Sequence, residues 1–594
     1  MTGAKGDRGS VFAQTPGPLP PKRINKTTLR PPTRATLPPM RNRPGNHLYY
    51  GDNLRVLRDH IADTSVDLIY LDPPFNSNAN YNVLFKSPAG TGSDAQIEAF
   101  EDSWHWNDTA EDAFDQVARS GHGATFELLR AMRGFLGDND MMAYLAMMAI
   151  RLIELHRVLK PTGSLYLHCD PTASHYLKLL LDSVFGADRY LNEIVWKRTS
   201  SHNSARRWGP IHDILLFYAR STGFVWNKVF GEYDVDYLQR YYRHIDDDGR
   251  RFRLSDLTGS GTRNGESGRA WGGFDPTAHG RHWAIPTDVK EQFPDQQQSS
   301  PHRWLDLFDS EGLVASSGEG TAWPHVRRYL DRAKGMAAQD MILDIPPLSA
   351  RHAERLGYPT QKPVALLERI VAASSNEGDV VLDPFCGCGT AVHAAQKLGR
   401  HWIGIDVTHL AISLIEKRMQ AAFPSASFTV EGTPKDLASA EDLAARDKYQ
   451  FQWWAVSMVD AVPYGGKKKG ADGGVDGLLY FKPDGKRTEK AIVSVKGGDH
   501  VGVTMIRDLH SAMVREKAPI GIFVTRVAPT RPMLTEATAV GRFEDGFGRT
   551  FPRLQILTVA DLFAGRKPDL PYPDPNLPFR RTAREETGKQ GALL

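Results

Sequence analysis

Apolar residues between positions 48 and 197 occur in two alternating patterns: short continuous runs, and longer stretches with an extended apolar face. A short apolar run is typical of a buried parallel strand, and the longer stretches are typical of helices. Their alternation predicts a parallel sheet covered by helices, and therefore the α/β class. The predicted strands are 65–72, 164–169 and 192–198, and the predicted helices are 141–159 and 173–186.

The alternation stops between about 199 and 355, a stretch rich in Arg, Gly, Trp, Tyr and His, and returns as 379–387, 390–399, 400–406 and 408–422. A second change of composition at 431–447 indicates a linker or connecting helix before another small α/β unit. The predicted organisation is an arm (1–45), a large α/β domain (46–430) interrupted at about 199–355, a linker (431–447), a small α/β domain (448–565) and a tail (566–594).

Length and composition support several domains without a membrane segment. A chain of 594 residues is too long for one core. The apolar run 141–153 is too short to span a bilayer and contains Arg151, so a buried helix is expected. Three cysteines favour a reducing cytoplasm over a disulfide framework. The first 45 residues are rich in proline and contain many basic residues but a single acid, Asp7. This composition predicts a disordered arm.

The segment VDLIYLDPPFN contains the first candidate chemistry. Its apolar strand must end at Pro73 and Pro74, which cannot donate to a sheet ladder. Asp72 and Phe75 are then expected at the carboxyl end of the strand, where open α/β sheets bind ligands. A proline turn with a solvated Asp72 is the alternative when this segment is considered alone.

The segment DVVLDPFCGCGT predicts a ligand-binding loop. A strand ends at Asp383, Gly387 and Gly389 allow close approach to the backbone, and Thr390 opens a helix whose N–H groups are unpaired. The next strand ends in Asp406, where an acid can accept both ribose hydroxyls. Together these features favour a nucleoside-type cofactor over a plain strand–helix turn.

D-P-P-F, F-C-G-C-G-T and YPTQKP (358–363) together resemble S-adenosylmethionine-dependent DNA amino-methyltransferases over roughly residues 47–425. The catalytic-type motif precedes the cofactor loop, an order similar to that of β-class enzymes, including type III modification subunits. The resemblance implies a Rossmann-like methyltransferase sheet, with a target recognition region inserted at about 199–355.

The resemblance also implies roles for individual residues. The Asp72 carboxylate and the Pro73 carbonyl would accept both N–H bonds of an adenine amine, Pro74 would fix the backbone, and Phe75 would stack on a flipped base. The remaining matches are cofactor positions. Asp383, Phe385, Gly387 and Gly389 resemble the methionine-side loop, Asp406 the ribose acid, Asp52 the acid near the cofactor adenine, and Thr360, Gln361, Lys362 and Pro363 the segment closing over the methionine end. For Lys362, a surface lysine at a helix start is an equal alternative.

Residues 467–498 resemble a Mrr-type restriction endonuclease module of the PD-(D/E)xK class. Asp476 matches the metal-binding Asp and Lys496 the motif lysine, which implies an Mg²⁺ site. Ser494, however, stands at the acid position, where relatives often carry Gln or Glu, and Gln452 stands where relatives often carry Glu. A DNA-binding remnant is therefore favoured over a working nuclease, with Lys467, Lys468 and Lys469 serving phosphate contacts in either case.

The sequence therefore predicts a DNA adenine-N6 methyltransferase that uses S-adenosyl-L-methionine on double-stranded DNA, in a restriction-modification or other defence role. Cytosine-N4 methylation is the nearest alternative, although Asp72 stands where cytosine-acting relatives more often have Ser. A combined methyltransferase-endonuclease and a DNA-binding module that only senses the cofactor are further alternatives. A homodimer and a separate restriction subunit remain open.

Overall fold

The structure is a computed structural model that describes most of the chain after the predicted arm. The described residues are 45–74, 80–86, 92–101, 105–200, 206–296, 298, 300–315, 323–349, 352–356, 358, 360–464, 474–571 and 585. The predicted arm falls almost entirely outside this set, as do Phe75 and Lys467–Lys469.

The largest sheet has nine strands in the order β16-β6-β7-β5-β2-β17-β18-β1-β19, so the predicted α/β class is confirmed. Neighbouring strands from β5 to β19 are parallel, and β7 is antiparallel to both β5 and β6. The central strands are β1 (Asn46–Tyr50), β2 (Val66–Leu71), β5 (Leu159–Cys169), β17 (Val380–Asp383), β18 (His401–Asp406) and β19 (Phe428–Glu431); β6 (Tyr190–Lys197), β7 (His212–Ala219) and β16 (Met341–Ile342) complete the sheet.

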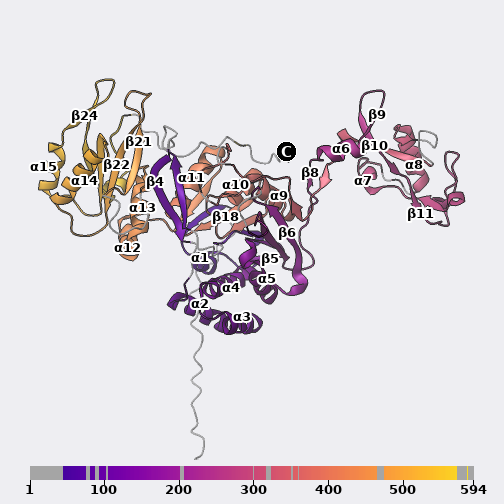
Figure 1. Ribbon diagram of the computed structural model, residues 1–594, viewed down its shortest axis with the longest axis horizontal. Helices are drawn as coiled ribbons and strands as arrows, with labels where there is room; N and C mark the ends of the chain where they lie inside the picture. The colour runs from indigo at the N-terminus through magenta and orange to yellow at the C-terminus, as the bar shows by residue number, and fades with distance from the viewer. Residues whose placement is uncertain are drawn as a thin grey trace, which may run out of the picture. The chain divides into compact units, whose positions relative to one another are not determined.

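Helices cover both faces of this sheet, as Figure 1 shows. One face packs against α1 (Asn53–His60), α4 (Asp140–Val158) and α5 (Pro171–Phe185), and the other against α9 (Val364–Ser374), α10 (Thr390–Lys397) and α11 (His409–Ala422). Alternation along the strands divides the core, because Ile69 and Leu71 face the first set and Leu68 and Tyr70 the second.

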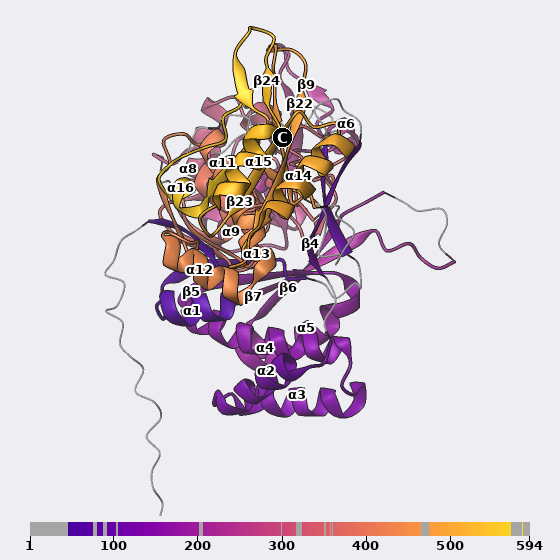
Figure 2. The ribbon, with the colours of Figure 1, turned by 90° about the vertical axis from the view of Figure 1, so that its left-hand side faces the viewer.

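Helix α4 is the apolar segment that the sequence predicts as a buried helix, and nearly all of its apolar side chains are buried. It lies between the sheet and two outer helices, α2 (Asp108–Arg119) and α3 (Gly123–Leu136) (Figure 2). Since it is enclosed on several sides, it can be apolar around most of its circumference. Within the described residues, no helix is long and apolar enough to cross a membrane.

The stretch 199–355 contributes strands to the large sheet and also forms smaller sheets of its own. Its first strand, β7, belongs to the large sheet, and β16 returns to pair with β6. Between them lies a small antiparallel sheet, β13-β14-β10-β9, with its own core around Trp304, Phe308 and Val326. Its strands are β9 (His244–Ile245), β10 (Arg251–Asp256), β13 (Val314–Ala315) and β14 (His325–Tyr329), accompanied by α6 (Val235–Tyr241), α7 (Thr287–Lys290) and α8 (Pro301–Ser310).

The C-terminal unit is a five-stranded sheet in the order β20-β21-β22-β23-β26, as expected for a second, smaller α/β domain. Its strands are β20 (Val462–Pro463), β21 (Gly477–Phe481), β22 (Glu489–Lys496), β23 (Ile520–Thr525) and β26 (Leu554–Thr558), and its helices include α13 (Lys448–Met458), α14 (Val503–Arg515), α15 (Arg531–Ala539) and α16 (Val559–Phe563). Helix α12 (Leu437–Arg446) occupies most of the predicted linker and buries Ala440, Leu443 and Ala444.

The other strands form short pairs. They are β3 (Asn80–Lys86) with β4 (Gly92–Glu101), β8 (Phe230–Gly231) with β15 (Met336–Ala337), β11 (Thr258–Ser260) with β12 (Arg281–Trp283), and β24 (Arg542–Glu544) with β25 (Thr550–Pro552).

Candidate active site

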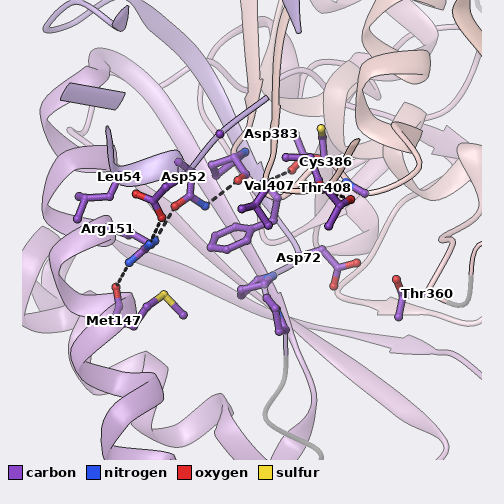
Figure 3. Close-up of a pocket in the computed structure, with 18 of the residues that line it drawn as sticks. Asp52, Leu54, Asp72, Met147, Arg151, Thr360, Asp383, Cys386, Val407 and Thr408 are labelled. Carbon is purple, nitrogen blue, oxygen red and sulfur yellow. Dashed lines mark hydrogen bonds and ion pairs between the residues drawn. The ribbon is translucent and has the colours of Figure 1, made fainter. Parts of the chain in front are cut away.

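One cavity of about 720 Å³ lies where β1, β2, β17 and β18 end. These strands are parallel, so their carboxyl ends meet at one edge of the sheet. Asp52, Asp72, Asp383 and Asp406 all line the cavity, although the chain separates them widely. In Figure 3, Asp52, Leu54 and Arg151 lie on one side of the pocket, and Asp72 and Thr360 on the other.

Asp72 follows directly after β2, and Pro73 and Pro74 line the same cavity. Lys362 Nζ lies 2.5 Å from Asp72 Oδ2, and the exposed fractions of the two side chains are 10% and 16%. Lys362 therefore reaches the predicted catalytic carboxylate and is not a surface lysine. The ammonium compensates a negative charge that would be costly to bury alone.

The loop after β17 has the shape that its glycines predict. Gly387 and Gly389 have φ values of +49° and +73°, which L side chains rarely adopt. A Cβ on Gly389 would lie 2.8 Å from Ile415 Cγ1, and one on Gly387 would lie 3.3 Å from the Tyr358 ring. Phe385 N donates to Asp383 Oδ1 at 3.1 Å, and burial raises the pKa of Asp383 above its usual range. The loop is thus closely packed, with backbone facing the cavity.

Asp406 connects this loop to the end of β18. Gly387 N donates to its Oδ2 at 3.0 Å, and both the amide and the hydroxyl of Thr408 donate to its Oδ1 at 2.8 Å. Burial raises the pKa of Asp406 to about 6. The carboxylate is held in a fixed orientation and can accept further hydrogen bonds, because each oxygen has two lone pairs.

Asp52 caps α1 by accepting a hydrogen bond from Arg55 N, and it also accepts one from Arg151 Nη2 at 2.5 Å. Arg151 Nε donates to Asn53 Oδ1 at 2.6 Å, and the Asn53 amide donates to Pro384 O at 2.8 Å. This network ties α4 and the end of β1 to the cofactor-type loop. Sequence reasoning assigned Arg151 no role in the site, although a single arginine in an apolar helix was the available signal.

The cavity collects most of the predicted site residues. Phe385, Gly387, Thr360 and Lys362 line it together with the four acids, Pro73 and Pro74. Gly389 and Pro363 instead stand just before α10 and α9, where they set the starts of these helices. Phe75 lies outside the described residues. Cavity residues that the sequence did not single out include Asn53, Tyr70, Arg151, Tyr358 and Thr408.

These residues fit a nucleoside-type cofactor. The cavity volume lies in the range of small-molecule sites. Asp406 supplies a fixed acid beside the glycine loop, and Leu54, Met147 and Val407 supply apolar wall. A Cβ at Gly387 would press on the Tyr358 ring, so this position favours glycine. Because glycine has no side chain, the backbone there can approach a ligand closely.

In the described part of the C-terminal unit, the surroundings of Asp476 do not form the expected Mg²⁺ site. Asp476 is buried and accepts hydrogen bonds from Gln452 Nε2 at 2.5 Å, Ser494 Oγ at 3.2 Å and Val495 N at 2.6 Å. Lys496 Nζ lies 4.0 Å from the same carboxylate. No group of three or more His, Cys, Asp or Glu side chains suited to a metal occurs among the residues that the structure describes. The donors around Asp476 thus do not fit Mg²⁺, which requires several oxygen ligands.

Comparisons with known families match both large parts of the chain. Residues 66–417 match the family described as DNA methylase, and residues 444–543 match the family described as restriction endonuclease. A Type II methyltransferase, M.EcaI from Enterobacter cloacae, is 34% identical over 277 residues, which is 46% of this chain and 57% of the relative. The Mod subunit of the Type III restriction-modification enzyme StyLTI from Salmonella typhimurium is 27% identical over 371 residues, which is 59% of this chain and 49% of the relative.

The chain therefore spans about half the length of these curated relatives. Among solved structures, a protein described as a DNA modification methylase from Thermus thermophilus, complexed with S-adenosyl-L-methionine, is 16% identical with a TM-score of 0.31. The match covers 65% of this chain and 99% of that chain.

Proposed function

The chain belongs to the DNA methylase family, and from this premise we propose that it transfers a methyl group from S-adenosyl-L-methionine to N6 of adenine in duplex DNA. The observation that carries the proposal is the convergence of Asp72, the glycine loop and Asp406 on one cavity. An amine-polarising acid and a cofactor site have to share a pocket for direct transfer.

The proposed chemistry depends on positioning and hydrogen bonding. Bound S-adenosyl-L-methionine supplies an electrophilic methyl group. Asp72 and the Pro73 carbonyl accept the two amine N–H bonds and favour the pyramidal nitrogen, whose lone pair can attack. Asp406 would accept the hydrogen bonds of the ribose hydroxyls, and the backbone at Gly387 would contact the methionine side of the cofactor. The target base must leave the duplex to reach this cavity.

Lys362 has a specific part in this proposal. Its ammonium donates to one oxygen of Asp72 at 2.5 Å. An incoming amine donates to the same carboxylate and therefore has to share it with Lys362 or displace it. The lysine would keep Asp72 oriented and charge-compensated between turnovers.

Adenine is favoured over cytosine because the motif begins with Asp72 rather than Ser. The Mod subunit and the Type II methyltransferase among the relatives support a restriction-modification role for this chain. We assign target recognition to the inserted part of 199–355, where arginines and aromatic rings surround a separate small core. Replacing this part with that of a relative should change the methylated sequence; an unchanged sequence would contradict the assignment.

The decisive test is mass spectrometry of DNA treated with the purified chain and S-adenosyl-L-methionine. N6-methyladenine in the digested product, absent with the Asp72→Ala variant, is the expected result. N4-methylcytosine as the main product would replace the adenine assignment. No methylated base on genomic DNA of varied sequence would overturn the proposed activity.

A further inference from the structure

A buried chain of hydrogen bonds leads from the cavity across three strands of the large sheet. The Tyr70 hydroxyl lies 2.9 Å from His168 Nδ1, and His168 Nε2 lies 3.2 Å from Asp213 Oδ2. An arginine on the far side, Arg198, places Nη1 3.1 Å from Asp213 Oδ1. The exposed fractions of Tyr70, His168 and Asp213 are 2%, 0% and 2%. Three polar groups are therefore held together where isolated ones would be costly.

Strand geometry places this chain beside the D-P-P-F acid. Tyr70 is the last residue but one of β2, and Asp72 follows directly after this strand. Both residues line the cavity. In the parallel register Tyr70 is opposite Tyr166 on β5, and His168 follows two positions later on the same side. The antiparallel strand β7 begins at this edge and brings in Asp213.

The electrostatics define the direction of the hydrogen bonds. Burial alone would raise the pKa of Asp213, but the hydrogen bond from His168 and the positive charges of Lys362 and Arg198 lower it. An ionised Asp213 accepts from His168 Nε2–H, so in the neutral imidazole Nδ1 is an acceptor. Tyr70 then donates its proton to Nδ1 and presents oxygen lone pairs at the cavity wall.

Methylation of an amine requires a proton acceptor near the nitrogen, and this hydrogen-bond chain can supply one. When the N6 lone pair forms the new N–C bond and the C–S bond breaks, N6 becomes cationic and must lose one proton. Asp72 is already engaged by Lys362 in a largely buried position, so an additional acceptor nearby is useful.

We propose that Tyr70, His168 and Asp213 form the proton acceptor of the methyl-transfer reaction. The N6 proton passes to the Tyr70 oxygen while the Tyr70 hydroxyl proton passes to His168 Nδ1. The resulting imidazolium is stabilised by the Asp213 carboxylate. After the product leaves, the same path returns the proton to water in the open cavity. This inference rests on the proposed amine methylation but concerns residues outside the D-P-P-F motif and the cofactor loop.

The test compares three purified variants in single-turnover methylation at saturating S-adenosyl-L-methionine and DNA. Tyr70→Phe and His168→Gln should each slow transfer by about 100-fold, the lower range for general acid–base catalysis. The matched control is Tyr166→Phe, which removes another buried hydroxyl from the same face, one that bonds Ser374 at 2.7 Å. This control should retain the wild-type rate, and all three should bind S-adenosyl-L-methionine like the wild type.

The pH profile separates a proton acceptor from a merely structural network. The wild-type rate should fall towards acid pH, and this dependence should be absent from His168→Gln. Charged and titratable groups facing the chain stay unchanged in the variants; they are Asp72, Asp170, Arg198, Lys362, Asp383 and Cys388.

If Tyr70→Phe, which keeps the ring packing, shows the wild-type rate and pH profile, the inference is wrong. The same conclusion follows if Tyr166→Phe is impaired equally. Absence of methylation by the wild-type chain would instead contradict the proposed function, so the two failures are distinguishable.

Discussion

At the scale of single residues, Asp72 is the side chain whose role is most sharply defined. Asp72→Ala should lower methyl transfer by at least about 100-fold, because the amine loses its charged hydrogen-bond acceptor. Binding of S-adenosyl-L-methionine, measured by calorimetry, should change little, since Asp406 and the glycine loop remain. A loss of cofactor affinity as large as that of a Gly387→Val variant would contradict the assignment.

A second residue, Asp406, predicts a pH dependence of cofactor binding. Its pKa is raised to about 6 by burial, and only the ionised form accepts from both ribose hydroxyls. Affinity should therefore be constant above about pH 7 and fall by up to about tenfold per pH unit below 6. Titration calorimetry between pH 5 and 8 measures this. Asp406→Asn should bind S-adenosyl-L-methionine weakly and without this pH dependence. If the affinity of Asp406→Asn still falls below pH 6 as in the wild type, another group causes the pH dependence.

Sequence reasoning located these acids because each one ends an apolar strand, and parallel strands end at one edge. The contact between Lys362 and Asp72 could not be predicted in the same way, since 290 residues separate the two. The same applies to Tyr70, His168 and Asp213, whose hydrogen bonds depend on sheet order and register. Local pattern fixes which residues end a strand, whereas partners depend on topology.

At the scale of elements, β7 was the main omission. Residues 212–219 read HDILLFYA, a continuous apolar run typical of a buried strand, yet the surrounding basic and aromatic composition hid it. The large sheet needs this strand, because β7 joins β5 to β6 and brings Asp213 into contact with His168. Composition averaged over 199–355 therefore did not reveal that residues 212–219 belong to the large sheet.

The start of α10 gives a prediction for stability. Gly389→Ala should destabilise the chain by about 1–2 kcal/mol or more, because φ is +73° and the new methyl would lie 2.8 Å from Ile415 Cγ1. Gly123→Ala is the matched control. This glycine opens α3, and a Cβ there would have no atom within 4 Å, so a change within about 1 kcal/mol is expected. Urea unfolding followed by circular dichroism compares them; equal midpoints would contradict the steric argument.

At the scale of the whole molecule, two parts of one chain match two different families. The first match ends at residue 417, before the stretch predicted as a linker (431–447), and the second begins at 444, near the end of that stretch. The sequence indicated this combination because each part resembles a known family in its motifs, D-P-P-F with the glycine loop in the first part and Asp476 with Lys496 in the second. Whether the C-terminal unit cleaves DNA depends on the side-chain contacts around Asp476, which a sequence motif does not reveal.

We predict that the C-terminal unit binds DNA without cutting it. Cleavage of a phosphodiester needs a metal held by several hard oxygen ligands, so that phosphate charge is neutralised and water is activated. Asp476 instead accepts from the Gln452 amide, the Ser494 hydroxyl and the Val495 amide. Gln452 and Ser494 stand where additional metal ligands would be needed. The Asp476 carboxylate therefore accepts hydrogen bonds in place of binding a metal. Lys496, at 4.0 Å from Asp476, remains suited to a phosphate contact.

Plasmid DNA, methylated and unmethylated, should therefore stay supercoiled with the full chain and Mg²⁺ or Mn²⁺, while gel-shift assays detect binding. Replacing both neutral donors, Gln452→Glu with Ser494→Glu, brings two carboxylates to Asp476 and should create Mn²⁺ binding measurable by calorimetry. Ser494→Ala, which removes a donor but adds no charge, is the control and should bind no metal. Robust cutting by the wild-type chain that disappears in an Asp476→Ala, Lys496→Ala variant would show that the unit is a working nuclease. In that case, the hydrogen bonds around Asp476 would have to rearrange when metal and DNA bind.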